Sequence, residues 1–527
     1  MDNSVFLLEI KALHKISSPE IIFERADEVY IRVSREEFGR MCIALHEQLH
    51  SPVMSYFASD EWRDRQVFTV RCAFLSPENR KWFFVVVEIP SHDPVFPSIA
   101  KEIYSASLFE REIKEMYGLE PSGNPDVRRL RLHDEVWPEG YYPLRKDFTG
   151  PAAGAITGKQ FQFVKVEGEG IFEVPVGPVH AGIIGPGHFR FSAAGEPVIN
   201  LEIRLGFTHR GAEKMFEGKS IREALKLSEC LAGDAAFAYS AAFCRAIEKI
   251  ADIPESDDAK IMRAIFIELE RMYNHVADIG GMAIDVGFSF PANLAAIIKE
   301  NMLALNMKLA GHRYLKHINT LGGVTKILSA DDKTLLLSSL RSIKRDFSEL
   351  EKILQSSVSF MDRVDTTGIL RKMTAEDFGV LGVAGRASGI PLDLRSVFPE
   401  AYNSVNFQPA REDKGDALAR LKIRLFEFKE SMRMIEEFAG KLEMTRINCP
   451  SDFALKAGFG LGYAESWRGP VLFWVKLDAK GIIERCKVVD SSFHNWQGLS
   501  FAVLGNIIPD FPLCNKSFNL SYAGNDL

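Results

Sequence analysis

The stretch RLGFTHRGAEKMFEGKS spans residues 204–220 and is the most distinctive part of the chain. Its centre places His209, Arg210, Glu213 and Lys214 within a single short run. An ordinary amphipathic helix does not need this polar density, because scattered charged residues are enough to keep its outer face in water. The run therefore marks a candidate functional region, and the sequence on either side of it shows what surrounds that region.

The chain after this stretch is predicted to be mainly helical. Apolar residues recur at alternating four- and three-residue steps in two segments: Leu336, Leu340, Ile343, Phe347, Leu350 and Leu354, and Leu418, Leu421, Leu425, Phe428, Met432 and Ile435. Each set predicts the apolar face of an amphipathic helix, with Arg, Lys and Glu on the other side. LAGDAAFAYSAAF (231–243) is rich in small residues, which predicts a central helix in close contact with its neighbours. Residues 470–490 return to strand-like alternation.

The chain before the stretch predicts a smaller mixed unit. VFTVRCAFL (67–75) and KWFFVVVEI (81–89) are β-rich and are joined by SPENR, which predicts a hairpin. Residues 98–118 have helical spacing, and Gly118 is placed to end that helix. TGPAAGAITGKQ (149–160) is small, Gly-rich and nearly uncharged, as is typical of a linker.

We therefore predict an α+β protein in three parts. A small α/β domain is expected at 1–148, a linker at 149–160, and a mainly helical domain with peripheral strands at 161–527.

Composition excludes several classes of function. The chain has 527 residues, 46% hydrophobic content and a net charge of −7, so no global attraction to nucleic acid or anionic lipid is expected. The first residues lack the pattern of a secretory signal, and no apolar run reaches the roughly 18 residues that span a bilayer. We expect a soluble cytoplasmic protein that reaches a membrane only through a partner. The seven cysteines are scattered and no two are separated by only two residues, so we expect them to be buried and reduced.

Three groups of residues resemble one family, in that family's order. The first comprises FEREIKEMYGLEPSGNPDVRRLRL (109–132) and YYPLRKDF (141–148); the second GPVHAGIIGPGHFRF (177–191), the stretch 204–220, ELERMYNH (268–275), NTLGGV (319–324) and GRASGIPLDLR (385–395); the third NIIPDFPLCNKSFNLSYAGNDL (506–527). The first resembles the 30-kDa subunit of respiratory complex I. The second and third resemble its 49-kDa subunit and the large subunits of group 4 nickel–iron hydrogenases. The chain is identified as a member of the large-subunit family of hydrogenase-related complexes, which includes formate hydrogenlyase.

The resemblance fails where hydrogenases hold their metals. Members of that family grip nickel and iron with two Cys-x-x-Cys pairs, because thiolates are soft ligands. The corresponding positions here are Ala232 and Ala235 in the first pair and Ser521 and Gly524 in the second. Methyl groups, a hydroxyl and a hydrogen cannot hold the metals. We therefore expect no metal bound by this chain and no hydrogenase activity.

The resemblance also implies a set of partners. In the relatives, a small subunit with a [4Fe–4S] cluster packs against the large subunit, and both dock on membrane subunits that resemble ion-pumping antiporters. The chain is then expected on the inner face of the cell membrane, peripheral and without nucleic acid. Complex I reuses its emptied cavity for quinone, but its histidine and tyrosine would fall near Pro186 and Gly233. His180, His188 and Tyr239 are the candidates nearby for a quinone or another acceptor.

The resemblance assigns roles to charged residues as well. His209, Arg210 and Glu213 correspond to a cavity wall and a route for protons or charge. Asp234 lies between the two lost cysteines of the first pair. Since a buried carboxylate is costly without a partner, it should pair with an arginine or carry a proton.

Candidate partners for Asp234 across the cavity are Arg386, Asp393 and Arg395. Glu268, Arg271 and His275 share one helix face, at i, i+3 and i+7, and suit either an interface or the cavity.

The sequence is compatible with three functions. The first is an electron-transfer subunit of a membrane-associated oxidoreductase complex without its own metal. The second is a quinone-reducing subunit, and the third is a scaffold whose emptied cavity does no chemistry. The electron donor, the acceptor and any pumped ion stay undetermined.

Overall fold

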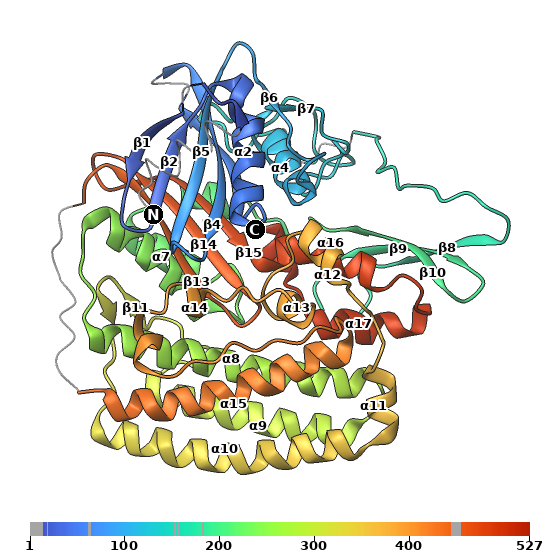
Figure 1. Cartoon of the computed structure of the whole chain (residues 1–527), viewed down its shortest axis with the longest axis vertical. Coiled ribbons are helices and arrows are strands. Elements are labelled where there is room, and N and C mark those ends of the chain that lie inside the picture. Colours follow the sequence, from blue (N-terminus) through green and yellow to red (C-terminus); the bar gives the residue numbers. More distant parts are fainter. Residues whose placement is uncertain are drawn as a thin grey trace.

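A computed structural model of the chain describes residues 14–17, 19–61, 65–151, 154, 157–181, 184–443 and 455–527. In Figure 1 an N-terminal sheet stands at the top, a second sheet lies in the middle, and long helices form the base. A three-stranded arm projects to one side. The sheets are mostly antiparallel and the long helices are gathered in one part of the chain, so the predicted α+β class is confirmed.

The N-terminal region is a five-stranded sheet with helices packed on it. Its strands are β1 (Glu20–Glu24), β2 (Glu28–Arg32), β3 (Ser55–Glu61), β4 (Val67–Ser76) and β5 (Lys81–Pro90), in the order β1-β2-β5-β4-β3. Within this sheet β2 and β5 run parallel, and the other neighbouring strands run antiparallel. The other elements are α2 (Arg35–Leu49), β6 (Val95–Pro97), η1 (Tyr104–Ala106), α4 (Ser107–Tyr117) and β7 (Glu120–Ser122). The predicted β4–β5 hairpin is confirmed.

The helix predicted over 98–118 is confirmed only in its second half. Regular helix begins at η1, because the Ser98 hydroxyl (2.6 Å) and the Ile99 N–H (2.8 Å) donate to the carboxylate of Glu110 and hold the preceding residues in turns. Gly118 ends α4 as predicted, at a φ of 68° that favours glycine.

The arm consists of β8 (Ile171–Val176), β9 (His188–Ala194) and β10 (Val198–Arg204), paired antiparallel in the order β10-β9-β8. The described residues between β7 and β8 form turns and extended chain.

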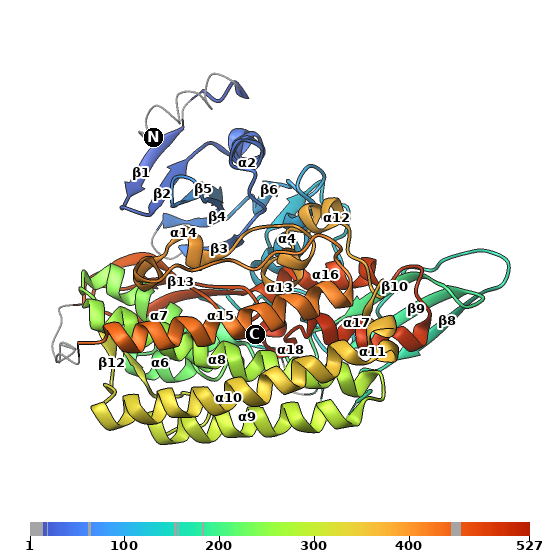
Figure 2. The ribbon, with the colours of Figure 1, turned by 60° about the horizontal axis from the view of Figure 1, so that its bottom comes forward.

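Helices dominate the part that follows the arm. They are α5 (Ala212–Phe216), α6 (Ile221–Ser228), α7 (Ala236–Ala251), α8 (Asp257–Asp285), α9 (Ser289–Ala310), α10 (Ala330–Ser356), α11 (Val358–Val364), α12 (Lys372–Asp377), α13 (Gly382–Ala387), α14 (Leu394–Val397), η2 (Glu400–Ser404) and α15 (Ala417–Lys441), with the short strands β11 (Asn319–Thr320) and β12 (Gly323–Val324). The long helices α8, α9, α10 and α15 pack as a bundle in which α8 and α10 each contact α9 and α15 (Figure 2).

The two predicted apolar helix faces are confirmed, since every residue of both sets is buried in α10 and α15. Phe347 and Phe428 stack between these helices with ring centroids 3.7 Å apart. The expected polar side is present in both helices, but in α15 it also contains the buried residues Arg420, Arg424 and Glu427. The reason is that α15 packs on α8 as well as on α10, so part of its polar side lies inside the protein, whereas Lys422 and Lys429 remain exposed.

The C-terminal region supplies the central sheet. It comprises β13 (Gly458–Glu465), β14 (Pro470–Leu477), β15 (Ile483–Asp490), α16 (Ser491–Ala502), η3 (Ile508–Asp510), α17 (Phe511–Phe518) and α18 (Tyr522–Asp526). One face of the sheet packs on α7, and the other joins the N-terminal sheet in a shared hydrophobic core. Trp474 of β14, for example, donates its indole N–H to the Tyr30 hydroxyl of β2 at 3.0 Å.

Two further expectations can be compared with the structure. In the described part of the chain, no helix combines the length and apolar character that a membrane crossing requires. The described cysteines are free, and all of them are buried except Cys230, for which the expected burial is wrong. Cys449 lies outside the described residues.

The small-residue segment forms the close contact expected of it, although its helix begins at Ala236 rather than 231. A Cβ atom on Gly462 of β13 would lie 1.9 Å from the carbonyl oxygen of Ala242 in α7. Only glycine fits between this helix and the central sheet without moving one of them.

We predict that Gly462→Ala lowers the free energy of unfolding by about 1–3 kcal/mol or more, because the sheet and α7 must separate. Gly440→Ala is the matched control, since a Cβ there meets nothing within 4 Å on the helix α15. It should raise stability by about 0.5–1 kcal/mol. Denaturant unfolding of both variants and the wild type checks this. A Gly462→Ala variant as stable as the wild type would show that the contact between β13 and α7 is not tight.

Candidate functional site

The two turns that carry the emptied positions meet at one place in the fold. In the first turn the Ala235 N–H donates to the Ala232 carbonyl at 3.0 Å, just before α7 begins. In the second the Ser521 hydroxyl accepts from the Gly524 N–H at 2.9 Å and caps α18. Arg468, in the tight turn between β13 and β14, reaches both turns.

Arg468 is the link between these segments. Its guanidinium donates to both carboxylate oxygens of Asp234, at 3.1 and 2.6 Å, and to the carbonyl of Asn519 at 2.6 Å. The Arg468 side chain is 7% exposed, whereas that of Asp234 is 40% exposed and lies at the mouth of the site. Burial opposes ionisation of Asp234, but Arg468 holds the pKa of the carboxyl below its usual value.

The prediction that Asp234 pairs with an arginine is therefore confirmed, but the proposed partners are wrong. Arg386, Asp393 and Arg395 belong to a separate buried cluster around α8 and α15. Arg468 was missed, although its place beside Trp467, just before the strands predicted at 470–490, was a usable signal.

The Asp234 backbone is held as firmly as its side chain. Its carbonyl accepts from the Asn274 amide (2.7 Å), the Trp467 indole (3.2 Å) and the Tyr273 hydroxyl (3.3 Å). Glu270, one turn earlier on α8, accepts from the N–H groups at the start of α7. α8 thus fixes the first emptied turn against the central helix.

The space behind the second turn is already occupied. The Tyr239 hydroxyl of α7 donates a short hydrogen bond to the carboxylate of Asp490. A Cβ atom on Gly524 would lie 2.9 Å from both the Tyr239 oxygen and the Asp490 Cγ. A cysteine at position 524 would therefore collide with this pair. Nothing in the sequence singled out Asp490.

The predicted cavity-wall residues lie together beside α18, but they differ in exposure. His209 donates its Nδ1–H to the Asp526 carbonyl at 2.7 Å, and burial lowers the pKa of the imidazole. Arg210 is exposed and donates to the carbonyls of Cys230 (3.2 Å) and Leu231 (2.8 Å), close to the first turn.

Glu213 is 5% exposed and lies in a cluster of cations. It contacts Arg485 at 2.7 Å and Lys487 at 3.1 Å, and Lys487 also contacts Glu112 of the N-terminal region. Burial alone would raise the pKa of Glu213, but Lys487, Arg485 and Arg131 lower it to about 2. Such a carboxyl stays ionised at neutral pH, so Glu213 suits a fixed charge better than a proton carrier.

The three candidates for an acceptor pocket are not brought together. His180 lies beside Tyr522, with ring centroids 6.3 Å apart, and burial lowers the pKa of its imidazole. Tyr239 lies beyond α18 and is fully buried. His188 begins β9 on the arm, where its Nε2 accepts from Arg190 at 3.3 Å. In the described part of the chain, no group of three or more His, Cys, Asp and Glu side chains is arranged to hold a metal ion.

Comparisons with known proteins agree with this architecture. The sequence model of the 30 kDa subunit of the respiratory-chain NADH dehydrogenase matches residues 31–153, and that of the 49 kDa subunit matches residues 285–455. The membrane-bound sulfane sulfur reductase, an archaeal respiratory membrane complex, contains a chain with the same fold, at a TM-score of 0.64 and 21% identity. That match covers 68% of this chain and 98% of the other.

Individual proteins with similar sequences indicate the family more closely. Formate hydrogenlyase subunit 5 of Escherichia coli (strain K12) is 30% identical over 451 residues, which are 84% of this chain and 79% of that protein. Hydrogenase-4 component G of the same organism is 29% identical over 451 residues, covering 84% and 78%. In Phocaeicola vulgatus, one protein of the NADH-quinone oxidoreductase is 30% identical over 363 residues, covering 65% and 69%.

The fold and these matches define a subunit in which the 30 kDa and 49 kDa regions of complex I are fused in one chain. Within that class, the chain belongs to the family of formate hydrogenlyase subunit 5 and hydrogenase-4 component G. The resemblance inferred from the sequence motifs is confirmed.

We predict that Glu213→Gln destabilises the protein by about 3–5 kcal/mol near neutral pH, because it leaves buried cations without their carboxylate. The pKa of Glu213 is lowered, so its stabilising contribution is complete above about pH 4.5 and is lost as the pH falls toward 2. The difference in unfolding free energy between wild type and variant should therefore shrink across that window. Denaturant titrations at several pH values test this, and a difference independent of pH would contradict it.

Proposed function

We propose that this chain is the electron-transfer subunit of a membrane-associated complex related to complex I and hydrogenase-4, and that it binds no nickel–iron centre. The observation that carries the proposal is the content of the emptied site. Ala232, Ala235, Ser521 and Gly524 stand at the ligand positions, and the Tyr239–Asp490 pair fills the space behind Gly524.

The groups that replace the thiolates are poor substitutes as ligands. Asp234 is already paired with Arg468, and Asp490 already accepts from Tyr239. These are hard oxygen groups engaged in hydrogen bonds, whereas a nickel–iron pair needs soft, unpaired sulfur. The Asp234–Arg468 pair offers an ionised lining beside which charge can be moved, which supports a site for electron transfer to an external acceptor.

The open mouth of the site supports a protein partner. A Cβ atom on Gly233 would meet nothing within 4 Å, and Asp234 is partly exposed. Nearby, α9 carries Lys299, whose charge acts on Asp234. The outer face of α9 exposes the apolar side chains of Phe290 and Ile297, at 65% and 58%. Such a face marks an interaction surface.

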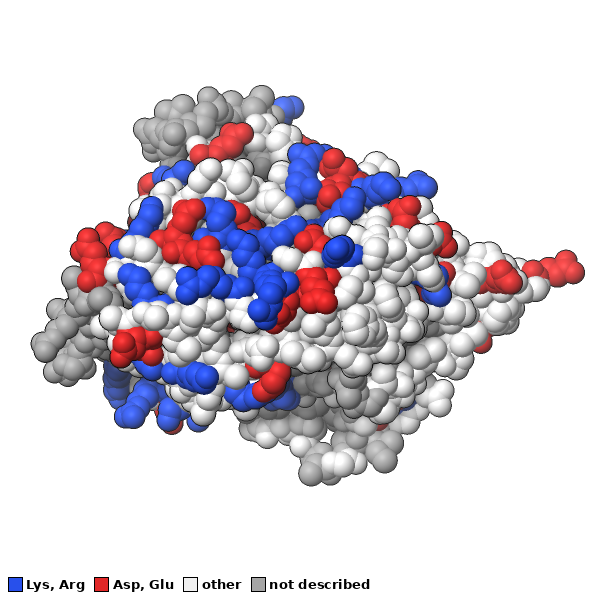
Figure 3. Space-filling view, turned by 90° about the horizontal axis from the view of Figure 1, so that it is seen from below, with Lys and Arg blue, Asp and Glu red and all other residues white. Residues whose placement is uncertain are grey.

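α10, in the same bundle, has a different outer face. Its exposed residues are charged or polar apart from Ala330, and Figure 3 shows Lys, Arg, Asp and Glu intermingled over this side of the molecule. We propose that the small subunit with the [4Fe–4S] cluster covers α9 and the mouth of the site. Docking and antiporter-like subunits would then hold the chain on the inner face of the cell membrane.

Quinone is the second candidate for the acceptor. The Nε2 atom of His180 is buried without a hydrogen-bond partner among the described residues, and as an N–H it could donate to a bound carbonyl. Tyr239, by contrast, is fully buried and hydrogen-bonded, so in this arrangement it does not reach a ligand.

We predict that Asp234→Ala slows electron transfer through the purified complex about tenfold or more, equivalent to about 1.4 kcal/mol, because it removes the ionised group at the mouth of the site. Asp257→Asn is the control, since that side chain is 92% exposed at the start of α8. The rate at which each variant complex reduces the acceptor should be measured and compared with the rate of the wild-type complex. An unchanged rate in Asp234→Ala would favour the scaffold function instead.

Metal analysis of the same complex tests the absence of a nickel–iron centre directly. We expect iron from the cluster of the small subunit and no nickel. One nickel per chain would overturn the proposal, whatever the electron-transfer rate.

A further inference from the structure

A second group of charged side chains is buried among the helices, away from the emptied site. It lies where α8, α13, α14, α15 and β13 come together, and none of its members is more than 3% exposed, apart from Glu465 at 4%. We call it the buried charge cluster; its members are Glu268, Arg271, His275, Arg386, Asp393, Arg395, Glu427 and Glu465.

Each arginine of the cluster contacts at least two carboxylates. Arg386 approaches Glu427 at 2.7 Å, Glu465 at 2.9 Å and Asp393 at 3.5 Å. Arg395 contacts Asp393 at 2.7 Å and Glu268 at 3.2 Å. Arg271 contacts Glu268 at 3.0 Å and Glu427 at 3.7 Å. The cluster is therefore one continuous network rather than a set of separate pairs.

His275 does not add a positive charge to this network. Its Nε2–H donates to Glu427 at 2.7 Å, and its Nδ1 has no hydrogen-bond partner in the described part of the chain. Burial lowers the pKa of the imidazole, which keeps it neutral.

The cluster therefore contains four carboxyl groups and three guanidinium groups, with a neutral histidine. If every carboxyl were ionised, one negative charge would be buried without a counter-charge, which is costly in a low-dielectric interior. The neighbouring Asp278–Arg424 pair (2.8 Å) is balanced and does not change this count. One bound proton would make the cluster neutral.

Two carboxyl groups are placed to share that proton. Asp393 and Glu465 both approach the same nitrogen, Nη1 of Arg386. Burial, together with the charge of Asp393, raises the pKa of Glu465 to about 7 in spite of Arg386. Arg395 and Arg386 instead hold the pKa of Asp393 below its usual value, against the effect of burial. Protons on such a pair titrate as a property of both groups.

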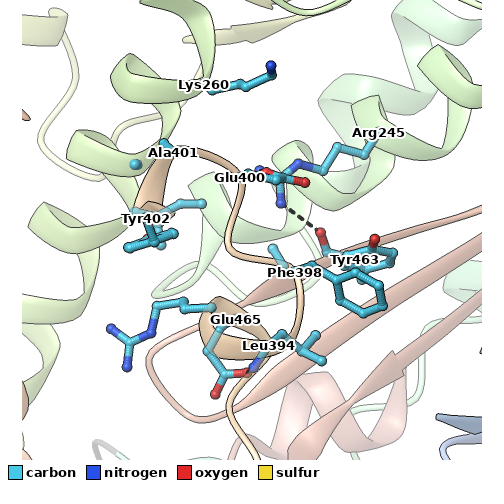
Figure 4. A pocket seen from close by; sticks show the side chains of 13 residues that line it. Arg245, Lys260, Leu394, Phe398, Glu400, Ala401, Tyr402, Tyr463 and Glu465 are labelled. Carbon is cyan, nitrogen blue, oxygen red and sulfur yellow. Dashed lines mark hydrogen bonds and ion pairs between the residues drawn. The ribbon is translucent and has the colours of Figure 1, made fainter. Parts of the chain in front are cut away.

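A hollow lies between the cluster and the exposed residue Glu400 (Figure 4). Its cavity volume is about 20 Å³, which is room for about one water molecule, and Glu465 and Arg395 line it. Arg245, Lys260 and Glu400 also line it, and Arg245 donates to the Tyr463 carbonyl at 2.9 Å. Tyr402, from the same wall, donates its hydroxyl to Glu268 at 2.7 Å. Water in this hollow would be in reach of the cluster.

We propose that the buried charge cluster binds one exchangeable proton at neutral pH, on the Asp393–Glu465 pair, and exchanges it with solvent through this hollow. This is a proton-binding site distinct from the emptied metal site.

A row of polar contacts leads from the cluster toward the emptied site. Along α8, Asp278 follows His275 and accepts from the amide of Asn519 at 2.5 Å. The Asn519 carbonyl in turn accepts from Arg468, the partner of Asp234. From Glu268 to Asp278 this row covers about 15 Å of helix. The suggestion that this proton balances charge arriving at Asp234 rests on the proposed function. The binding of the proton to the cluster does not depend on that function.

Infrared difference spectroscopy of the full chain tests the proton directly. Wild type should show the C=O band of protonated carboxyl groups, part of which disappears as the pH rises through about 7. Glu465→Gln should lose one carboxyl group's share of that band. Glu465→Asp should keep it with a shifted midpoint. In Asp393→Asn the cluster keeps three carboxyl groups for its three arginines. The midpoint of the Glu465 titration should therefore fall well below neutral pH.

Glu110→Gln is the matched control. Glu110 is a fully buried carboxyl of α4 whose pKa burial also raises to about 7, but it lies outside the cluster. Its variant should lose a different share of the band and leave the share assigned to Glu465 intact. If wild type and Glu465→Gln show the same band at every pH, the proposal is wrong.

The pH dependence of stability gives a second readout. A carboxyl whose pKa is raised on folding stabilises the protein below its unfolded pKa of about 4.5, and this contribution is lost as the pH rises to about 7. Relative to wild type, the Tm of Glu465→Gln should therefore increase from pH 5 to pH 8. A constant difference would overturn the proposal. Neither readout needs electron transfer, so both can succeed if the proposed electron-transfer function fails.

Discussion

The contact of Arg468 with Asp234 is the interaction on which the rest of the site depends. It joins the turn before α7 to the turn before α18, two segments that lie far apart in the sequence. Under the proposed function, this ion pair takes the place, as the central cross-link, of the metals that hold the corresponding turns in hydrogenases. Because Arg468 is almost fully buried, losing its carboxylate partner would leave an uncompensated charge, which is far more costly than losing a surface pair.

The emptied site is consistent with a new use rather than decay. A site that had lost only its ligands would leave space at positions 232, 235, 521 and 524. Here the Tyr239–Asp490 pair fills the space behind Gly524. The Asp234 carbonyl accepts three hydrogen bonds, and α8 supplies two of the donors. Side chains that have adapted to one another in this way give the site a defined geometry of its own, and polar networks of this kind are stable only when their members are satisfied.

Buried charge is also unusually abundant outside that site. α15 shows why the amphipathic pattern alone was misleading: its apolar residues face α10, and its arginines and glutamates face α8. The side of α15 that packs on α8 is closed to solvent, so the polar side chains there must be neutralised inside the protein. Arg424 pairs with Asp278, and Glu427 with Arg386 and His275. That requirement, rather than a demand of the emptied site, explains where Arg386, Asp393 and Arg395 lie.

The sequence by itself determined the α+β class, the N-terminal hairpin, the two long helices and the family, because hydrophobic spacing and short motifs depend on neighbours in the chain. It also identified the emptied positions and the need of Asp234 for an arginine. Only the tertiary structure decided which arginine that is, that Asp490 fills the site, and that Glu427 and Glu465 complete a cluster with Arg386. These pairings join residues far apart in sequence, and each depends on how helices and sheets pack. No local pattern encodes which of several buried arginines will face a given carboxylate.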